Sequence, residues 1–249
     1  MKYLDIKKCF IGIERNKPEC IDLMCSLAKG VAGVEVKPLP SRYPQGAEKV
    51  LIESVTGREV PQGGLPADAG VIVLNVTTVS TIGKYLATGM PLVTRRMTVD
   101  GDAVKEPKNV EVIVGTPLQE VLDFCGVKED VTVGKVIMGG PMMGVAVADL
   151  ATPVLKQNNG LLVFSEAKAT LPAPQPCIRC GRCIDACPMG LEPVVIAGAF
   201  NKKDAAALDK LCIDLCMLCG SCSYVCPAKR PVTQTMSLAK DFAKKEASK

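Results

Sequence analysis

The chain has 249 residues, of which 48% are hydrophobic and 22% are charged, and its formal net charge is +4. This size allows two or three domains with buried cores, and no apolar run approaches the roughly 20 residues of a membrane helix, so we expect a soluble or peripheral protein. The absence of histidine excludes histidine-based triads, Rieske ligation and zinc-finger histidines. Four tyrosines, five phenylalanines and no tryptophan leave few stacking platforms for nucleic acid.

The first 91 residues are predicted to form part of an α/β domain. Short apolar runs typical of buried strands alternate with segments that begin at proline or a turn and end at glycine. We expect strands over 9–13, 34–36 and 71–76, and helices over 18–30, 46–55 and 78–87. Ile21, Met24 and Leu27 are expected to face inward from the first helix. Because strands and helices alternate from about the tenth residue, we predict βαβ units that belong to a larger domain.

Residues 92–165 are predicted to form a small β-grasp-like domain with adjoining strands. Strands are expected over 91–99 and 110–114 around a turn at 100–102, then a helix over 118–124 that stops at Gly126, then strands over 135–138 and 161–164. The segment GGPMMG at 139–144 is interpreted as a tight turn in preference to a ligand-binding loop. Residues 166–176 contain three prolines and are predicted to be an interdomain linker.

One cysteine pattern occurs twice within residues 177–249, and it is the strongest signal in the sequence. Each copy reads Cys-x2-Cys-x2-Cys-x3-Cys-Pro, and the second copy begins 39 residues after the first. In proteins with two [4Fe-4S] clusters, the first three cysteines of such a run hold one cluster and the fourth ligates the other. We therefore expect one cluster on Cys177, Cys180, Cys183 and Cys226, and a second on Cys216, Cys219, Cys222 and Cys187.

Structural zinc does not match this pattern, because zinc sites usually combine two separated cysteine pairs. Apolar residues at helical intervals predict helices over 192–200 and 204–216 and an exit helix over 232–247. A small β-type ferredoxin has little room for such helices, so we expect an α-helical ferredoxin module. The lysines at its end, Lys240, Lys244, Lys245 and Lys249, are interpreted as a solvated tail in preference to a specific contact.

Five cysteines lie outside the repeat. Cys9, Cys20, Cys25 and Cys125 occupy apolar faces, so we interpret them as small buried hydrophobic residues. Cys212 lies one helical turn before Cys216 and is interpreted as a packing residue, because the repeat already supplies eight ligands.

The order of these motifs resembles the RnfC family of the Rnf electron-transport complex, which is related to the NADH-binding flavoprotein subunit of respiratory complex I. The resemblance covers essentially the whole chain and rests on the twin cysteine run together with IERNKPE at 13–19, YPQGAEK at 43–49, GGLP at 63–66, NVTT at 75–78 and GGPMMG at 139–144.

The resemblance implies an α+β multidomain fold. A flavin-domain remnant would occupy 1–91, an SLBB β-grasp domain 92–165, and the two-cluster domain 177–249. It also implies that a flavin mononucleotide (FMN) pocket is lined by Gly46, Ala47, Glu48, Asn75 and Thr78. From their residue types alone, the glycine would be a helix start and the last two would be turn and cap residues.

The family passes electrons from NADH through flavin into iron-sulfur clusters, and feeds a membrane complex that exchanges electrons with ferredoxin while it translocates an ion. The resemblance therefore implies an electron-transfer subunit of an NADH:ferredoxin oxidoreductase, with other Rnf subunits as partners and peripheral contact with the cytoplasmic face of the membrane. No catalytic side chain is expected. Full-length members carry a glycine-rich flavin segment before the equivalent of Cys9, so we expect FMN and NADH binding to need a further segment or a partner chain.

Two alternatives stay open at this point. A cobalamin reductase of the propanediol-utilisation type shares flavin, SLBB and cluster domains, and association with microcompartment shell proteins would favour it. A docking subunit without redox chemistry is the other alternative, and flavin retained on purification would argue against it.

Overall fold

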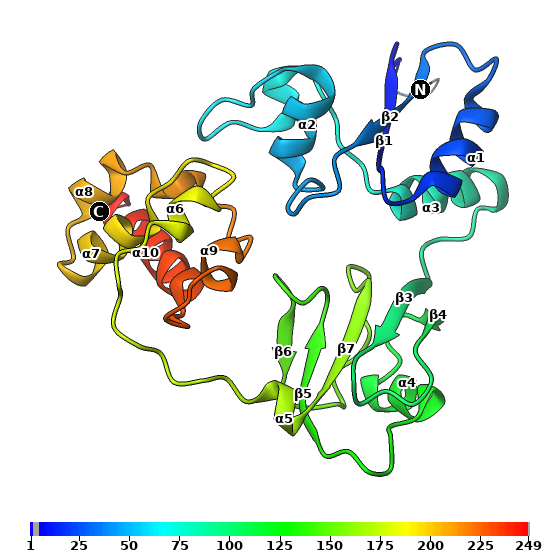
Figure 1. Cartoon of the computed structure of the whole chain (residues 1–249). Coiled ribbons are helices and arrows are strands. Elements are labelled where there is room, and N and C mark those ends of the chain that lie inside the picture. The colour runs from blue at the N-terminus through cyan, green and yellow to red at the C-terminus, as the bar shows by residue number, and fades with distance from the viewer. Residues whose placement is uncertain (2–4, 249) are drawn as a thin grey trace.

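The computed structural model describes residue 1 and residues 5–248. Three parts follow one another along the chain: an α/β part, a part built on a mixed sheet, and a helical part (Figure 1). The expected α+β multidomain class is confirmed. Within the described residues, every helix is too short or too polar to span a bilayer.

The first part is built on one βαβ unit. Strand β1 (Cys9–Glu14) pairs in parallel with β2 (Val34–Leu39), and α1 (Pro18–Ala28) connects them. Pro18 stands in the first turn of α1, where its fixed φ suits the helix and its missing N–H costs nothing. Helix α2 (Glu48–Thr56), the 3-10 helix η2 (Pro66–Ala69) and α3 (Val76–Thr88) follow.

The strand predicted over 71–76 is wrong. Residues 71–75 have no regular structure, and α3 begins at Val76. A strand must pair its backbone groups with a neighbouring strand, and in the described residues the sheet of this part consists of β1 and β2 alone. Asn75 instead caps α3, because its side chain accepts a hydrogen bond from the backbone N–H of Thr77 at 2.9 Å.

The inward orientation predicted for Leu27 is also wrong. This side chain is 61% exposed, and neither α1 nor α3 contains a buried residue, although Ile21 and Met24 are partly buried. Apolar periodicity identified the helix correctly, but in the described residues no element covers this part of its surface.

The second part is a five-stranded mixed sheet in the order β4-β3-β7-β5-β6. Its elements are β3 (Thr94–Asp100), β4 (Lys108–Ile113), α4 (Leu118–Cys125), β5 (Val133–Met138), β6 (Val145–Val147) and β7 (Gly160–Ser165). Strands β3 and β7 are parallel, and the other pairs are antiparallel. Helix α4 packs its apolar side against the sheet, and the core contains Met97, Val99, Leu118, Leu122, Leu161 and Val163.

The predicted linker is partly ordered at its two ends. Its first residues form α5 (Glu166–Ala169), and Lys135 Nζ donates a hydrogen bond to the Ala169 carbonyl at 3.1 Å. At its far end, the Gln175 N–H donates to the Ala228 carbonyl at 2.8 Å. Residues 170–176 between them have no regular structure.

The third part repeats one backbone motif. It contains α6 (Arg182–Asp185), α7 (Pro193–Asn201), α8 (Ala205–Lys210), the 3-10 helix η3 (Ile213–Leu215), α9 (Ser221–Tyr224) and α10 (Val232–Ala247). Helices α6 and α7 begin 39 residues before α9 and α10, which is the spacing of the cysteine runs. The sequence repeat is therefore a structural repeat.

The helix predicted over 204–216 is interrupted. Helix α8 ends at Lys210, and Cys212 adopts a left-handed backbone with φ of 52° before η3 begins. A left-handed residue cannot continue an α-helix, so the chain turns here and carries Cys216 away from the axis of α8. The exit helix predicted over 232–247 is confirmed as α10.

Candidate metal centre

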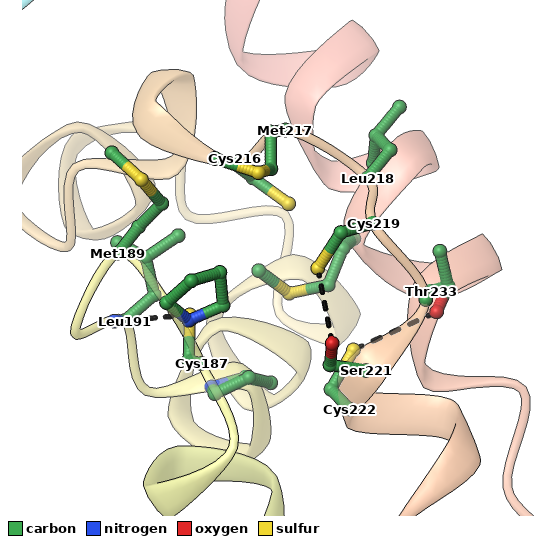
Figure 2. A pocket seen from close by; sticks show the side chains of 14 residues that line it. Cys187, Met189, Leu191, Cys216, Met217, Leu218, Cys219, Ser221, Cys222 and Thr233 are labelled. Carbon is green, nitrogen blue, oxygen red and sulfur yellow. Dashed lines mark hydrogen bonds between the residues drawn. The ribbon is translucent and has the colours of Figure 1, made fainter. Parts of the chain in front are cut away.

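Four thiols from both cysteine runs line one pocket of the helical part (Figure 2). Cys216, Cys219 and Cys222 come from the segment that joins η3 to α9, and Cys187 follows α6. The structure thus brings together the four cysteines predicted for the second cluster. Most of the remaining lining is apolar, with Met189, Leu191, Pro193, Met217, Leu218 and Met236 around the thiols.

Left-handed backbone at two positions shapes the segment that carries three of these cysteines. Leu218 has φ of 56° and Gly220 has φ of 87°, and the equivalent residues of the first run, Arg179 and Gly181, have φ of 55° and 78°. A left-handed conformation is strained for Leu and Arg, and such strain concentrates at functional sites. The repeat of this strain in both runs indicates that each loop is shaped for the same ligand.

Burial controls the ionisation of the pocket thiols. It raises the pKa of Cys216, although a hydrogen bond from the Leu218 backbone and the nearby Lys240 act in the opposite direction. It also raises the pKa of Cys222, against a hydrogen bond with Thr233. A desolvated thiolate needs a compensating cation, and a coordinated metal supplies it by deprotonating the thiol. The buried sulfur donors therefore fit a thiolate-ligated metal group.

The shape of the pocket fits a cluster with four iron corners. A cubane is held at separate irons, so its thiolates surround a volume and do not converge on one point. The four thiols line a pocket in this way, and in residues 1 and 5–248 no three cysteine or carboxylate side chains are grouped to hold a single metal ion.

Hydrogen-bond donors lie beside the sulfur atoms. The Leu191 N–H donates to Cys187 Sγ at 3.4 Å, and Thr233 Oγ1 lies 3.6 Å from Cys222 Sγ. Cys219 Sγ donates to Ser221 Oγ at 3.4 Å, an arrangement that would reverse on a thiolate. Figure 2 shows these three contacts as dashed lines. Such neighbours tune the potential of an iron-sulfur cluster.

Lys240 is a site residue that the sequence analysis missed. Its Nζ donates hydrogen bonds to the carbonyls of Asp214 at 2.7 Å and Cys216 at 2.6 Å. The interpretation of the lysines as a solvated tail is therefore wrong for Lys240, whereas Lys244 and Lys245 are not held in this way and Lys249 lies outside the described residues. Helix α10 turns Lys240 towards the cysteine loop, which charge counting alone does not indicate.

The first cysteine set is more open to solvent. Cys177 and Cys180 are exposed, whereas Cys183 and Cys226 are partly buried. Burial raises the pKa of Cys183, and the nearby Cys177 and Cys180 add to the effect, so these three thiols share one neighbourhood. The Arg179 N–H donates to Cys177 Sγ at 3.4 Å.

The remaining cysteines divide into two groups. Cys125 is buried in the core of the second part, and Cys212 packs partly buried against the helical core, as expected for packing residues. Cys9 is partly buried. The buried position predicted for Cys20 and Cys25 is wrong, because both are exposed on α1.

The five predicted flavin positions lie at the starts of two helices. Gly46 is exposed, with open space where a Cβ would point, and Ala47 and Glu48 begin α2. Asn75 is engaged as the cap of α3, and Thr78 is exposed on that helix. The pocket of the second cysteine set includes none of the five.

Gln45, beside these positions, was missed by the sequence analysis. It is 2% exposed, and its Nε2 donates to Ser54 Oγ at 3.0 Å, but its buried Oε1 has no hydrogen-bond partner. An unpaired buried amide oxygen is costly in isolation. Together with the open space at Gly46, it fits a polar ligand at the start of α2.

The first and third parts touch through two side chains. Tyr43 Oη donates a hydrogen bond to the Cys219 carbonyl at 2.6 Å, and Gln62 Nε2 donates to the Asp214 carboxylate at 3.0 and 3.2 Å. Partial burial raises the pKa of Tyr43, and the nearby Cys219 adds to this, so the phenol remains a donor. Contacts across 176 residues of sequence have no local signal, so the sequence analysis missed them.

Three family descriptions match successive parts of the chain. The Nuo51 FMN-binding domain matches residues 1–84, the SLBB domain matches 96–146, and the 4Fe-4S dicluster domain matches 176–230. Fold and site therefore define an iron-sulfur protein that combines a flavin-type domain, an SLBB domain and a dicluster domain.

Curated relatives specify the family, and each of the three described here is the RnfC-type component of its complex. The chain is 46% identical over 204 residues to that of the proton-translocating ferredoxin:NAD(+) oxidoreductase complex of Clostridium ljungdahlii, covering 82% of this chain and 44% of the relative. It is 45% identical over 197 residues to that of the Na(+)-translocating complex of Acetobacterium woodii, covering 79% and 44%. The counterpart from the ion-translocating oxidoreductase complex of Rhodobacter capsulatus is 35% identical over 238 residues, covering 95% and 46%.

The chain belongs to this RnfC family of ion-translocating oxidoreductase complexes, as its motifs predicted. It spans less than half the length of these three relatives.

Proposed function

We propose that this chain is the iron-sulfur electron-transfer portion of an RnfC protein in an ion-translocating ferredoxin:NAD+ oxidoreductase complex. The observation that carries the proposal is the pocket in which thiols from both cysteine runs meet. Bound [4Fe-4S] clusters supply one-electron transfer, and the protein sets their potential and position. The names of the relatives favour this complex over a cobalamin reductase or a docking subunit without redox chemistry.

The proposed ligand sets follow the exchange of the fourth cysteine. One cluster would be held by Cys216, Cys219, Cys222 and Cys187, which line one pocket. The other would be held by Cys177, Cys180, Cys183 and Cys226. Its support is the proximity of the first three thiols and the structural repeat, which relates Cys226 to Cys187.

The surrounding residues have separate roles in this proposal. Apolar lining such as Met236 and Leu191 excludes water, while the Leu191 N–H and the Thr233 hydroxyl supply hydrogen bonds to sulfur. Lys240 holds the carbonyl of Cys216 and places a positive charge beside a site whose charge becomes more negative on reduction.

For the first part we propose an FMN site at the start of α2, with Gly46, Ala47 and Glu48 beside the unpaired oxygen of Gln45. Asn75 and Thr78 at the start of α3 belong to the same proposal. Further polypeptide, from the same chain or from a partner, would complete this domain. The exposed apolar side chains of α1 and α3 support that, since cores normally cover such surfaces.

The proposed partners are the other subunits of the complex, with NADH and ferredoxin reached through it. The proposed location is the cytoplasmic face of the membrane, with peripheral contact. Both proposals come from the names of the relatives, which describe subunits of ion-translocating complexes that act on ferredoxin and NAD+.

Cysteine variants purified without oxygen test the ligand assignment. Cys187→Ala should lower the iron content from about eight to about four per chain, because it removes a ligand of one [4Fe-4S] cluster. Cys212→Ala is the matched control and should keep about eight irons, because Cys212 lies outside both ligand sets. Equal iron contents in the two variants would contradict the assignment of Cys187.

A further inference from the structure

The loop of the second cysteine set is the place where all three parts of the chain meet. The flavin-type part reaches it through Tyr43, which donates to the Cys219 carbonyl at 2.6 Å, and through Gln62. The SLBB part reaches it through the turn between β5 and β6: a Cβ added at Gly220 would lie 2.8 Å from the Met142 carbonyl oxygen. The motif at 139–144 thus forms a tight turn that packs against the cysteine loop.

Tyr43 also belongs to the loop that leads from β2 to α2, where the proposed flavin residues lie. Only two residues separate it from Gly46. A phenol on a rigid ring that donates one short hydrogen bond fixes both direction and distance between the segments it joins. One side chain therefore links the start of α2 to the backbone of a proposed cluster ligand.

The first cysteine set has the opposite surroundings. Residues 171–180 are exposed throughout, including Cys177 and Cys180. Ile178, between these two cysteines, is 68% exposed, and Tyr224 in the neighbouring helix α9 is 76% exposed. Exposed aromatic and aliphatic side chains beside a redox site are suited to transient contact with another protein.

We infer that Tyr43 is a positioning residue that holds the second cysteine set against the flavin-type domain, and that the first set faces a separate redox protein. This inference rests on the proposed function and adds an order to it. The flavin-type domain and the second set form one fixed pair, and the surface around Ile178 is the docking side for the next carrier.

Tyr43→Phe tests the inference, because it removes one oxygen atom and keeps the ring. Tyr224→Phe is the matched control, since Tyr224 is exposed in the same helical part and near the first set. Both variants are prepared without oxygen and analysed for iron. Hydrogen exchange of amides 217–221 and the midpoint potential of each cluster are then compared with the unmodified chain, with Cys187→Ala used to assign the signals.

In Tyr43→Phe we expect faster exchange at 217–221 and a shifted potential for the second set alone, with about eight irons retained. Tyr224→Phe should leave both unchanged. If Tyr43→Phe keeps its irons and neither exchange nor potential changes, the inference is overturned and the proposed function stands. If the unmodified chain contains no iron-sulfur clusters, the proposed function fails and the inference fails with it.

Discussion

Replacing Lys240 by methionine should loosen the loop of the second cysteine set. The side chain makes two hydrogen bonds, to the carbonyls of Asp214 at 2.7 Å and Cys216 at 2.6 Å. A hydrogen bond to a charged group contributes about 1.5 to 3 kcal/mol. Lys240 is only partly buried, so we discount the pair to about 2 kcal/mol. This corresponds to a roughly 30-fold rise in the fraction of molecules with the loop open.

Iron release to a water-soluble chelator measures this opening. The unmodified chain should lose iron in two phases, first from the exposed first set and then from the second set. Lys240→Met should accelerate the slow phase by about 30-fold, because release follows the open population when opening is fast. Lys244→Met, in the last turn of α10, is the control and should match the unmodified chain. Equal slow phases in the two variants would refute the role assigned to Lys240.

Three further predictions concern the SLBB part and its contact with the cysteine loop. The Ser165 hydroxyl holds the pKa of Asp102 below its usual value, so this carboxylate stabilises the fold above about pH 4 and the contribution is lost as the pH falls through the folded pKa. Asp102→Asn should therefore make unfolding, followed by circular dichroism, less sensitive to acid, and an unchanged acid transition would count against this. Leu122→Ala should destabilise the domain by about 2 to 5 kcal/mol, measured as lost amide protection in β3 and β7. Gly220→Ala should raise hydrogen exchange at 139–144, because the new Cβ would lie 2.8 Å from the Met142 oxygen at a left-handed φ; unchanged exchange there would contradict the close contact.

Local patterns predicted most elements of the fold. The exit helix over 232–247 and the hairpin around 100–102 depend on neighbours close in sequence, and both were found where expected. The failures have tertiary causes. The segment 71–76 is apolar enough for a strand but has no strand to pair with, and the helix predicted over 204–216 breaks at the left-handed Cys212.

The candidate site shows the same division. The eight cysteines of the repeat were identified because cluster ligation imposes a fixed spacing, and the structure places Cys187 with the other run as that spacing requires. Lys240 and Tyr43 were missed because each acts through a backbone carbonyl that is distant in sequence. A tyrosine or lysine in this role has no motif, and only the packing of α10 and of the loop before α2 reveals it.

The central claim, that the chain holds two [4Fe-4S] clusters for electron transfer, is tested most directly by chemical analysis with electron paramagnetic resonance. Protein purified without oxygen should contain about eight irons and eight acid-labile sulfides per chain, and dithionite should produce signals of two interacting [4Fe-4S] clusters. Zinc in place of iron, or reduced protein without such signals, would contradict the claim.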